Sequence, residues 1–150
     1  MFKKCIFLSV CVLITAGILI SCSDKKDNAT FPQSTTFKQI LSSENIVKIS
    51  VKNGDNGETR ETIDKQKINS FINKIENEKL YRDDNSQPRG GFLYSVNFYY
   101  KDKVGSYTYT LGYGFSKSED FVQTMPVGYC KAENENRIKD VVSEFYEELK

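Results

Sequence analysis

Two segments near the middle of the chain alternate bulky apolar side chains with small polar ones. The first, FLYSVNFYY, covers residues 92–100, and the second, GSYTYTLGYGF, covers residues 105–115. Successive side chains of a strand point to opposite faces, so each segment has one apolar, aromatic face. That face carries Phe92, Tyr94, Val96, Phe98 and Tyr100 in the first segment and Tyr107, Tyr109, Leu111, Tyr113 and Phe115 in the second. A sheet built from such strands needs a cover on one side.

Three further stretches have strand character. IVKISVK, residues 46–52, alternates in the same way, and the NGDNG after it tolerates positive φ, which predicts a hairpin turn. The chain then returns as a polar strand over residues 58–63. Residues 121–130 form a weaker candidate, which Pro126 interrupts and so confines to a sheet edge.

Two segments have the spacing of amphipathic helices. The first covers about residues 65–77, with Asp64 as N-cap and with Ile63 and Ile68 at the positions of a hydrophobic staple. The second closes the chain, with Asn134 or Asn136 as its cap. The apolar stripes comprise Ile68, Phe71, Ile72 and Ile75 in the first helix and Ile138, Val141, Val142, Phe145, Tyr146 and Leu149 in the second.

The expected fold is α+β. A hairpin and a three-strand meander form an antiparallel sheet, and the two amphipathic helices cover it in a second layer, with element order ββαβββα. This single domain is expected over residues 37–150.

The N-terminus predicts export and attachment to a membrane. Lys3 and Lys4 precede an uncharged run over residues 5–20, the form of a secretory signal peptide. The sequence Leu-Ile-Ser-Cys ending at Cys22 resembles the lipobox of bacterial lipoproteins. This resemblance implies cleavage after residue 21, diacylation of the Cys22 thiol, and a lipid-anchored, extracytoplasmic place at the cell membrane or outer membrane. The alternative is an uncleaved N-terminal membrane helix with an incidental cysteine.

Residues 22–36 are mostly polar and are expected to form a tether. In the mature chain Cys130 would be the only other cysteine, so no disulfide forms within the domain; a Cys22–Cys130 bridge is the competing possibility if Cys22 carries no lipid. Removal of Lys3 and Lys4 leaves 19 basic residues against 20 acidic ones. This near-neutral balance argues against a nucleic-acid partner.

Two other resemblances bear on the host. The segment GGFLYSVNFYYKDK, with Tyr94, Val96, Phe98 and Tyr99 in a Tyr-x-apolar-x-Phe-Tyr pattern, is similar to small uncharacterised α+β lipoprotein domains of low-GC Gram-positive bacteria. That similarity implies a fold and no activity. The SDKKD after Cys22 instead resembles export signals of surface lipoproteins in Bacteroides-like bacteria, so both hosts stay open.

The residue types exclude several kinds of chemistry. The chain has no histidine, which rules out Ser-His-Asp and Cys-His arrangements. We expect no cofactor and no metal, and we expect Cys130 to be a packed, inert thiol. The paired acids Asp83–Asp84 and Glu119–Asp120 are expected to be solvated rather than catalytic. A calcium site formed by Asn53, Asp55 and Glu58 is the alternative to a plain turn.

The best candidate for recognition is the loop over residues 81–91, which carries Arg82, Asp83, Asp84 and Arg89. The tyrosines could line a groove for sugars or peptides, but their apolar neighbours favour the core. The tyrosines concerned are Tyr94, Tyr100, Tyr107, Tyr109 and Tyr113.

The expected function is that of a non-enzymatic envelope lipoprotein that binds a protein or wall component. An inhibitor or immunity protein with one protein partner is the first alternative. A hydrolase that uses carboxylates or a Ser–Lys pair is the second.

Overall fold

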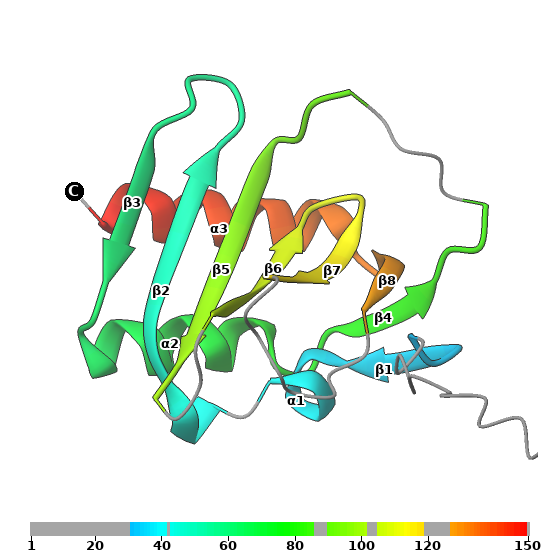
Figure 1. Cartoon of the computed structure of the whole chain (residues 1–150), viewed down its shortest axis with the longest axis horizontal. Helices are drawn as coiled ribbons and strands as arrows, with labels where there is room; N and C mark the ends of the chain where they lie inside the picture. The colour runs from blue at the N-terminus through cyan, green and yellow to red at the C-terminus, as the bar shows by residue number, and fades with distance from the viewer. Residues whose placement is uncertain (1–30, 42, 86–89, 102–104, 119–126, 150) are drawn as a thin grey trace, which may run out of the picture.

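The computed structural model describes residues 31–41, 43–85, 90–101, 105–118 and 127–149. In these residues the chain forms an eight-stranded antiparallel sheet and three α-helices (Figure 1). The strands are β1 (Ser34–Thr36), β2 (Ile46–Asn53), β3 (Thr59–Thr62), β4 (Lys79–Arg82), β5 (Tyr94–Tyr100), β6 (Ser106–Thr110), β7 (Gly114–Lys117) and β8 (Gly128–Ala132). The helices are α1 (Phe37–Ile40), α2 (Lys65–Ile75) and α3 (Glu135–Glu148), with a 3-10 turn at Ser43–Asn45. The predicted α+β class with an antiparallel sheet is confirmed.

The strands lie in the order β1-β4-β8-β7-β6-β5-β2-β3. The predicted hairpin is β2–β3, and β2 also pairs with β5, which places β5 inside the sheet. Strands β5, β6, β7 and β8 follow as sequential antiparallel neighbours. The sheet therefore joins strands that are close in the chain, except at the pairs β2–β5, β1–β4 and β4–β8.

One face of the sheet is apolar and packs against helices. The strand register places the buried side chains of Ile49, Val96, Phe98 and Tyr107 on this face. Helices α2 and α3 lie behind the strands on the same side (Figure 1). Burial of each such side chain stabilises the fold by about 1.5–3 kcal/mol.

The two helices meet through aromatic side chains and begin at the predicted caps. The rings of Phe71 and Phe145 stack with their centroids 4.2 Å apart. Asp64 accepts hydrogen bonds from the first turn of α2, and Asn134 accepts one from the first turn of α3. The predicted hydrophobic staple is wrong, because Ile63 is 77% exposed and its side chain does not pack under the helix.

A buried carboxylate joins the end of α2 to the start of α3. Glu78 accepts hydrogen bonds from the backbone N–H of Asn134 and from Nη1 of Arg137, both at 2.7 Å. Arg137 also donates from Nη2 to the carbonyl of Lys74, at 2.6 Å. The guanidinium thus bridges the two helices, and the buried charge of Glu78 is compensated.

The folded body begins earlier than the expected tether allows. Phe31 is buried in the core, and Ser34–Thr36 form β1 instead of a free linker. Thr36 and Gln39 form a capping box at the start of α1. The tether was predicted from the polar composition of residues 22–36, and a strand as short and polar as β1 lacks the alternation that identifies a strand.

The element order differs from the expected one in the second half of the chain. The segment GSYTYTLGYGF is two strands, β6 and β7, because Gly112 and Gly114 adopt φ of 78° and 104° and turn the chain. A Cβ at position 114 would lie 2.3 Å from the Gly128 carbonyl oxygen, so the close approach of β7 to β8 needs glycine. Residues 81 and 82, expected in a loop, end β4. The weak strand expected over residues 121–130 falls largely outside the described residues, and β8, which contains its last three residues, lies between β4 and β7 and not at the expected sheet edge.

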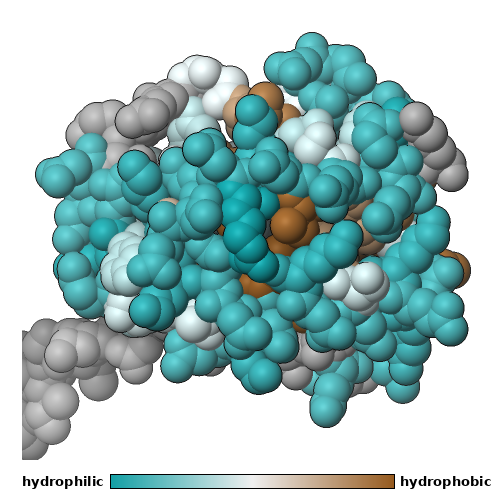
Figure 2. Space-filling view, turned by 180° about the vertical axis from the view of Figure 1, so that it is seen from behind, coloured by the Kyte–Doolittle hydropathy of each residue, from teal (hydrophilic) through white to brown (hydrophobic). Residues whose placement is uncertain are grey.

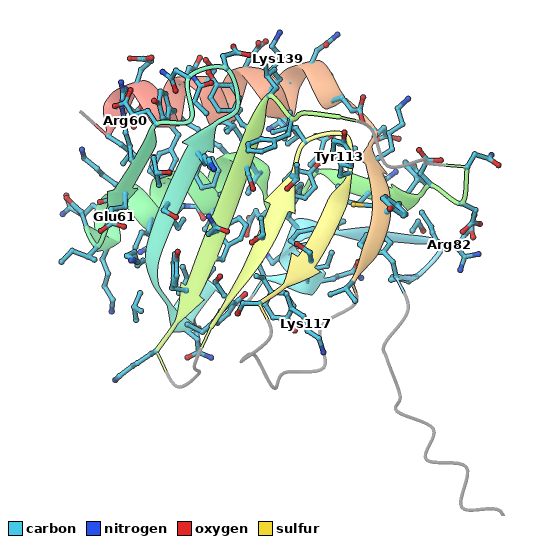
Figure 3. All side chains as sticks on the ribbon, turned by 45° about the horizontal axis from the view of Figure 1, so that its top comes forward. Arg60, Glu61, Arg82, Tyr113, Lys117 and Lys139 are labelled. Atoms are coloured by element: carbon cyan, nitrogen blue, oxygen red, sulfur yellow. The ribbon has the colours of Figure 1, made fainter. Side chains whose placement is uncertain are left out.

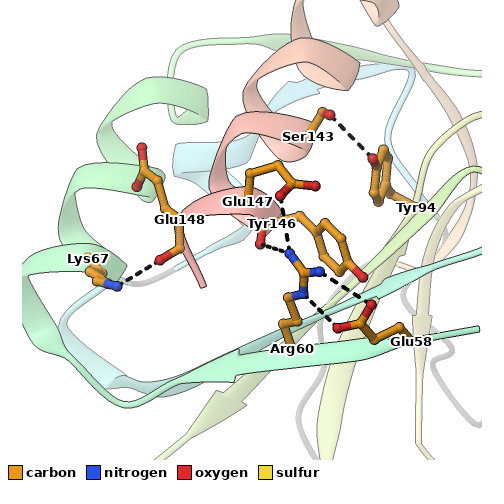
Figure 4. Close-up of polar contacts among 8 residues, drawn as sticks. All are labelled: Glu58, Arg60, Lys67, Tyr94, Ser143, Tyr146, Glu147 and Glu148. Atoms are coloured by element: carbon orange, nitrogen blue, oxygen red, sulfur yellow. Dashed lines mark hydrogen bonds and ion pairs between the residues drawn. The ribbon is translucent and has the colours of Figure 1, made fainter. Parts of the chain in front are cut away.

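Arg60 of β3, the strand at the edge of the sheet, contacts residues of α3 (Figure 4). Its Nε lies 2.8 Å from Oε1 of Glu58, and its Nη1 donates to the carbonyl of Tyr146 at 3.2 Å. The same nitrogen lies 3.4 Å from Glu147 Oε2, and the guanidinium carbon lies 4.0 Å from the centre of the Tyr146 ring. The hydrogen bond with Glu58 raises the pKa of Arg60, so the residue stays charged. We call this arrangement the Arg60 clamp.

Candidate functional site

The predicted binding residues lie where β4 ends. Arg82 is the last residue of that strand, Asp83 and Asp84 follow it, and Arg89 lies outside the described residues. Figure 3 shows Arg82 and Glu61 at opposite ends of the sheet. Three of the four predicted binding residues, Arg82, Asp83 and Asp84, are thus consecutive and lie at the same end of the sheet.

These residues mainly hold their own turn. Arg82 forms a two-pronged ion pair with Asp84, with Nε 2.7 Å from Oδ1 and Nη2 3.1 Å from Oδ2. Asp83 accepts the backbone N–H of Asn85 at 3.2 Å and donates its own N–H to the carbonyl of Tyr129 at 3.1 Å. The two carboxylates have separate partners and do not converge on one point. An exposed ion pair of this kind contributes about 0–1 kcal/mol.

Two exposed tyrosines stand beside that turn, Tyr81 of β4 and Tyr129 of β8. Tyr81 is 40% exposed and Tyr129 is 41% exposed. The register sets Lys131 opposite Tyr81, and the hydroxyl of Tyr81 donates to Glu133 at 3.1 Å. We call Tyr81, Tyr129, Lys131 and Glu133 the tyrosine surface.

The tyrosine surface faces away from the core. Leu80, Cys130 and Ala132 alternate with its residues along β4 and β8, and all three are buried. Because side chains alternate along a strand, Tyr81, Tyr129 and Lys131 share the opposite face. Large aromatic rings exposed together are typical of surfaces that contact another molecule.

On the side opposite the buried apolar residues, the central strands carry a row of small polar side chains, of which Ser50 is buried. Ser50, Asn97 and Thr108 stand opposite one another on β2, β5 and β6. Asn97 donates from Nδ2 to Ser50 at 3.2 Å, and its Oδ1 accepts the hydroxyl of Thr108. Glu61 of β3 and Ser116 of β7 extend the row at its two ends. We call these five residues the polar face.

The helix side offers a different surface. Figure 2 shows it as mostly hydrophilic, with a small apolar area between teal side chains. Lys139 of α3 is exposed on this side of the molecule (Figure 3). The apolar stripes of the helices are used in the core, as the spacing predicted.

Three of the five tyrosines that were considered as groove residues belong to the core. Tyr100, Tyr107 and Tyr109 are buried on the helix side of the sheet, and burial raises the pKa of Tyr109. Tyr94 and Tyr113 are half-buried, and their hydroxyls reach the Ser143 hydroxyl at 3.3 Å and the Gly91 carbonyl at 2.8 Å. The favoured core interpretation is confirmed for the first three, and these rings form no groove.

Cys130 is a free, buried thiol, as predicted. It lies opposite Arg82 on the neighbouring strand, a position where a cation could lower its pKa. Burial raises the pKa of Cys130 to about 12, and a backbone hydrogen bond with Phe115 lowers it by less. The thiol is therefore protonated at neutral pH, and a protonated thiol is a poor nucleophile.

In the β2–β3 turn, side-chain oxygens accept hydrogen bonds from backbone N–H groups of the same turn. Asn53 accepts the backbone N–H of Asp55, and Asn56 accepts that of Glu58, both at 2.8 Å. Within the described residues, no group of three or more cysteine, aspartate and glutamate side chains could hold a metal ion. These contacts support the plain turn. The acid pair Glu119–Asp120 lies outside the described residues.

Comparisons with known proteins add no family. No protein-family model matches the chain, and no curated protein or solved structure is significantly similar to it. In the part of the chain that the structure describes, no helix is both long and apolar enough to cross a bilayer.

Sequence reasoning missed Tyr129, Lys131 and Glu133 as neighbours of the predicted loop. The segment GYCKA does alternate, with Cys130 and Ala132 on one side, and this pattern could have placed Tyr129 and Lys131 on the outer face. The pairing of β8 with β4, about fifty residues earlier in the chain, left no local signal.

Proposed function

We propose that the chain is a lipid-anchored protein of the cell envelope whose folded part is a non-enzymatic binding or accessory module. Residues 1–21 act as the signal peptide, and lipid on Cys22 holds the chain at the cell membrane or outer membrane. The Leu-Ile-Ser-Cys sequence after an uncharged run supports the anchor. A diacylglyceryl group bound to the sulfur through one thioether would carry two acyl chains, which suffice for stable attachment.

The polar face is the surface that we propose for binding. We infer a two-layer domain in which α2 and α3 cover one face of the sheet and leave the other for a partner. Ser50, Asn97 and Thr108 hold one another in fixed positions across three strands, while Glu61 and Ser116 are exposed at the ends of the row. A surface that is ordered before binding loses less conformational entropy when a partner arrives. We propose that a protein or wall component contacts this face.

Two observations favour binding over catalysis. The Cys130 thiol is buried and keeps its proton, and the carboxylates of Asp83 and Asp84 are engaged by separate groups. General acid–base work needs groups that converge on one reacting atom.

Site-directed cross-linking in intact cells tests the binding face. A photoreactive amino acid at position 61 or 116 is expected to give the same cross-linked product, because both residues end the polar face. The matched control places it at position 139, which is exposed on α3. Equal yields from all three positions, or none from 61 and 116, would contradict the proposed face.

The anchor is tested separately. The Cys22→Ala variant is expected to lack the mass of the lipid and, without the cysteine of the Leu-Ile-Ser-Cys motif, to retain residues 1–21. A variant that still matures and partitions like the parent chain would overturn the proposed attachment.

A further inference from the structure

The chain enters its folded body beside the tyrosine surface. Phe31 is buried, its ring stacks on Phe115 at 6.5 Å, and a Cβ on Gly128 would lie 3.2 Å from its Cβ. The Gln33 carbonyl then accepts the backbone N–H of Arg82 at 3.1 Å, and Ser34 pairs with Tyr81. The first described residues thus contact β8 and β4, the two strands that carry the exposed tyrosines.

Only eight residues separate Cys22 from Phe31. A segment of that length spans about 16 Å when flexible and at most about 30 Å when extended. If Cys22 carries lipid, as the proposed function states, the end of the sheet formed by β1, β4 and β8 is held close to the lipid headgroups. The hairpin β2–β3 forms the other end (Figure 1).

The chemistry of the tyrosine surface suits that position. A tyrosine ring has an apolar body and a polar hydroxyl, and tyrosines are enriched where a membrane meets water. The charges on β4 and β8 and on the residues directly after each strand balance, because Lys79, Arg82 and Lys131 are matched by Asp83, Asp84 and Glu133. Attraction to anionic lipid is therefore not the main force, and a zwitterionic bilayer is a sufficient partner.

We propose that the tyrosine surface lies on the headgroup region of the membrane to which Cys22 is anchored, with Tyr81 and Tyr129 in the interface. This inference depends on the proposed lipid anchor. It orients the molecule, because the β2–β3 end of the sheet then points away from the bilayer. Glu61, at the outer end of the polar face, becomes accessible to a partner.

The chain contains no tryptophan, which makes a fluorescence test specific. Tyr129→Trp introduces one indole into the tyrosine surface of the full lipidated chain, reconstituted into phosphatidylcholine vesicles. Ile63→Trp is the matched control, because Ile63 is highly exposed next to β3, the strand at the opposite end of the sheet. Tyr81→Trp repeats the test at a second position, in case one variant folds poorly.

The expected result is a shift of emission to shorter wavelength and strong quenching by brominated phosphatidylcholine for Tyr129→Trp and Tyr81→Trp, but not for Ile63→Trp. High salt is expected to leave the quenching unchanged. If the variants float with the vesicles and all three are quenched equally, or none is, the membrane contact is overturned while the anchor stands. If none of the variants floats with vesicles, the anchor itself fails and the inference fails with it.

Discussion

Arg60 and Arg82 stand near opposite ends of the sheet and form the same local pair. Each contacts a carboxylate two residues away, Glu58 for Arg60 and Asp84 for Arg82, at 2.8 and 2.7 Å. Their surroundings differ: the Arg60 side chain is 18% exposed and that of Arg82 is 40% exposed. Arg60 also reaches the ring and carbonyl of Tyr146 on α3.

The comparison shows that the ion pair itself does not decide what an arginine does. Arg60 covers a buried tyrosine and joins two distant segments of the chain, so its removal would loosen tertiary structure. Arg82 closes a local turn beside two tyrosines that stay exposed. At the β3 end of the sheet the arginine contributes to tertiary stability. At the β4 end the arginine leaves Tyr81 and Tyr129 exposed.

The largest expected effect comes from removing the ring through which α3 packs on α2. Phe145 precedes Tyr146 on α3, and its ring packs on Phe71. We expect Phe145→Ala to lower the free energy of unfolding by about 3–5 kcal/mol, because it leaves a cavity between the helices. Urea denaturation followed by circular dichroism measures the change. Phe145→Leu should lose less, and a cost for Phe145→Ala below about 1 kcal/mol would contradict the packing described.

The next effect is expected from Arg60→Met. Methionine keeps much of the side-chain length but loses the contacts to Glu58, Glu147 and the Tyr146 carbonyl. The variant should be less stable than the parent, by less than Phe145→Ala. Hydrogen exchange should become faster in the last turn of α3, where the clamp acts. Unchanged exchange in that turn would show that the clamp does not hold the helix.

A pH series tests whether Arg82 acts on the thiol opposite it. Burial raises the pKa of Cys130 from 9.0 to about 12 in the folded chain, so its stabilising contribution is complete below pH 9 and is lost as the pH rises toward 12. Between pH 7 and pH 10 the parent chain should lose about 1 kcal/mol more free energy of unfolding than Cys130→Ala. Equal losses would mean that the thiol is not shielded, as expected if the guanidinium stabilised a thiolate.

The smallest effect is expected from Arg82→Met. The pair with Asp84 is exposed and local, so the free energy of unfolding should change by no more than about 0.5 kcal/mol. The same denaturation assay measures it. A loss as large as that of Arg60→Met would remove the distinction between the two arginines.

The sequence predicted the elements in which apolar side chains recur at the spacing of a strand or of a helix. The alternation of Val96 and Phe98 with Ser95 and Asn97 identified β5, and the stripe that includes Phe71 and Ile75 identified α2. Strands β1 and β4 were missed. Their sequences, STT and KLYR, contain one buried apolar residue, Leu80, and they are strands because neighbouring strands supply hydrogen bonds.

The candidate site was predictable in part for the same reason. A loop rich in arginine and aspartate indicated Arg82, Asp83 and Asp84 as surface residues. The spacing of Arg82 and Asp84 also allows them to pair, since residues two apart on an extended chain share a face. The neighbourhood of Tyr129 depends on the pairing of β4 with β8, which no local pattern encodes.

The order β1-β4-β8 at one end of the sheet has a consequence for how the chain is made. β4 lies between β1 and β8, and β8 begins 46 residues after β4 ends, so one edge of β4 stays open until the ribosome has synthesised the chain as far as Ala132. Contacts this distant in the chain form slowly, and an open edge invites wrong pairing. A ribosome that stops before β8 would therefore release a product that cannot complete its sheet, and a chaperone or protease would be expected to act on it.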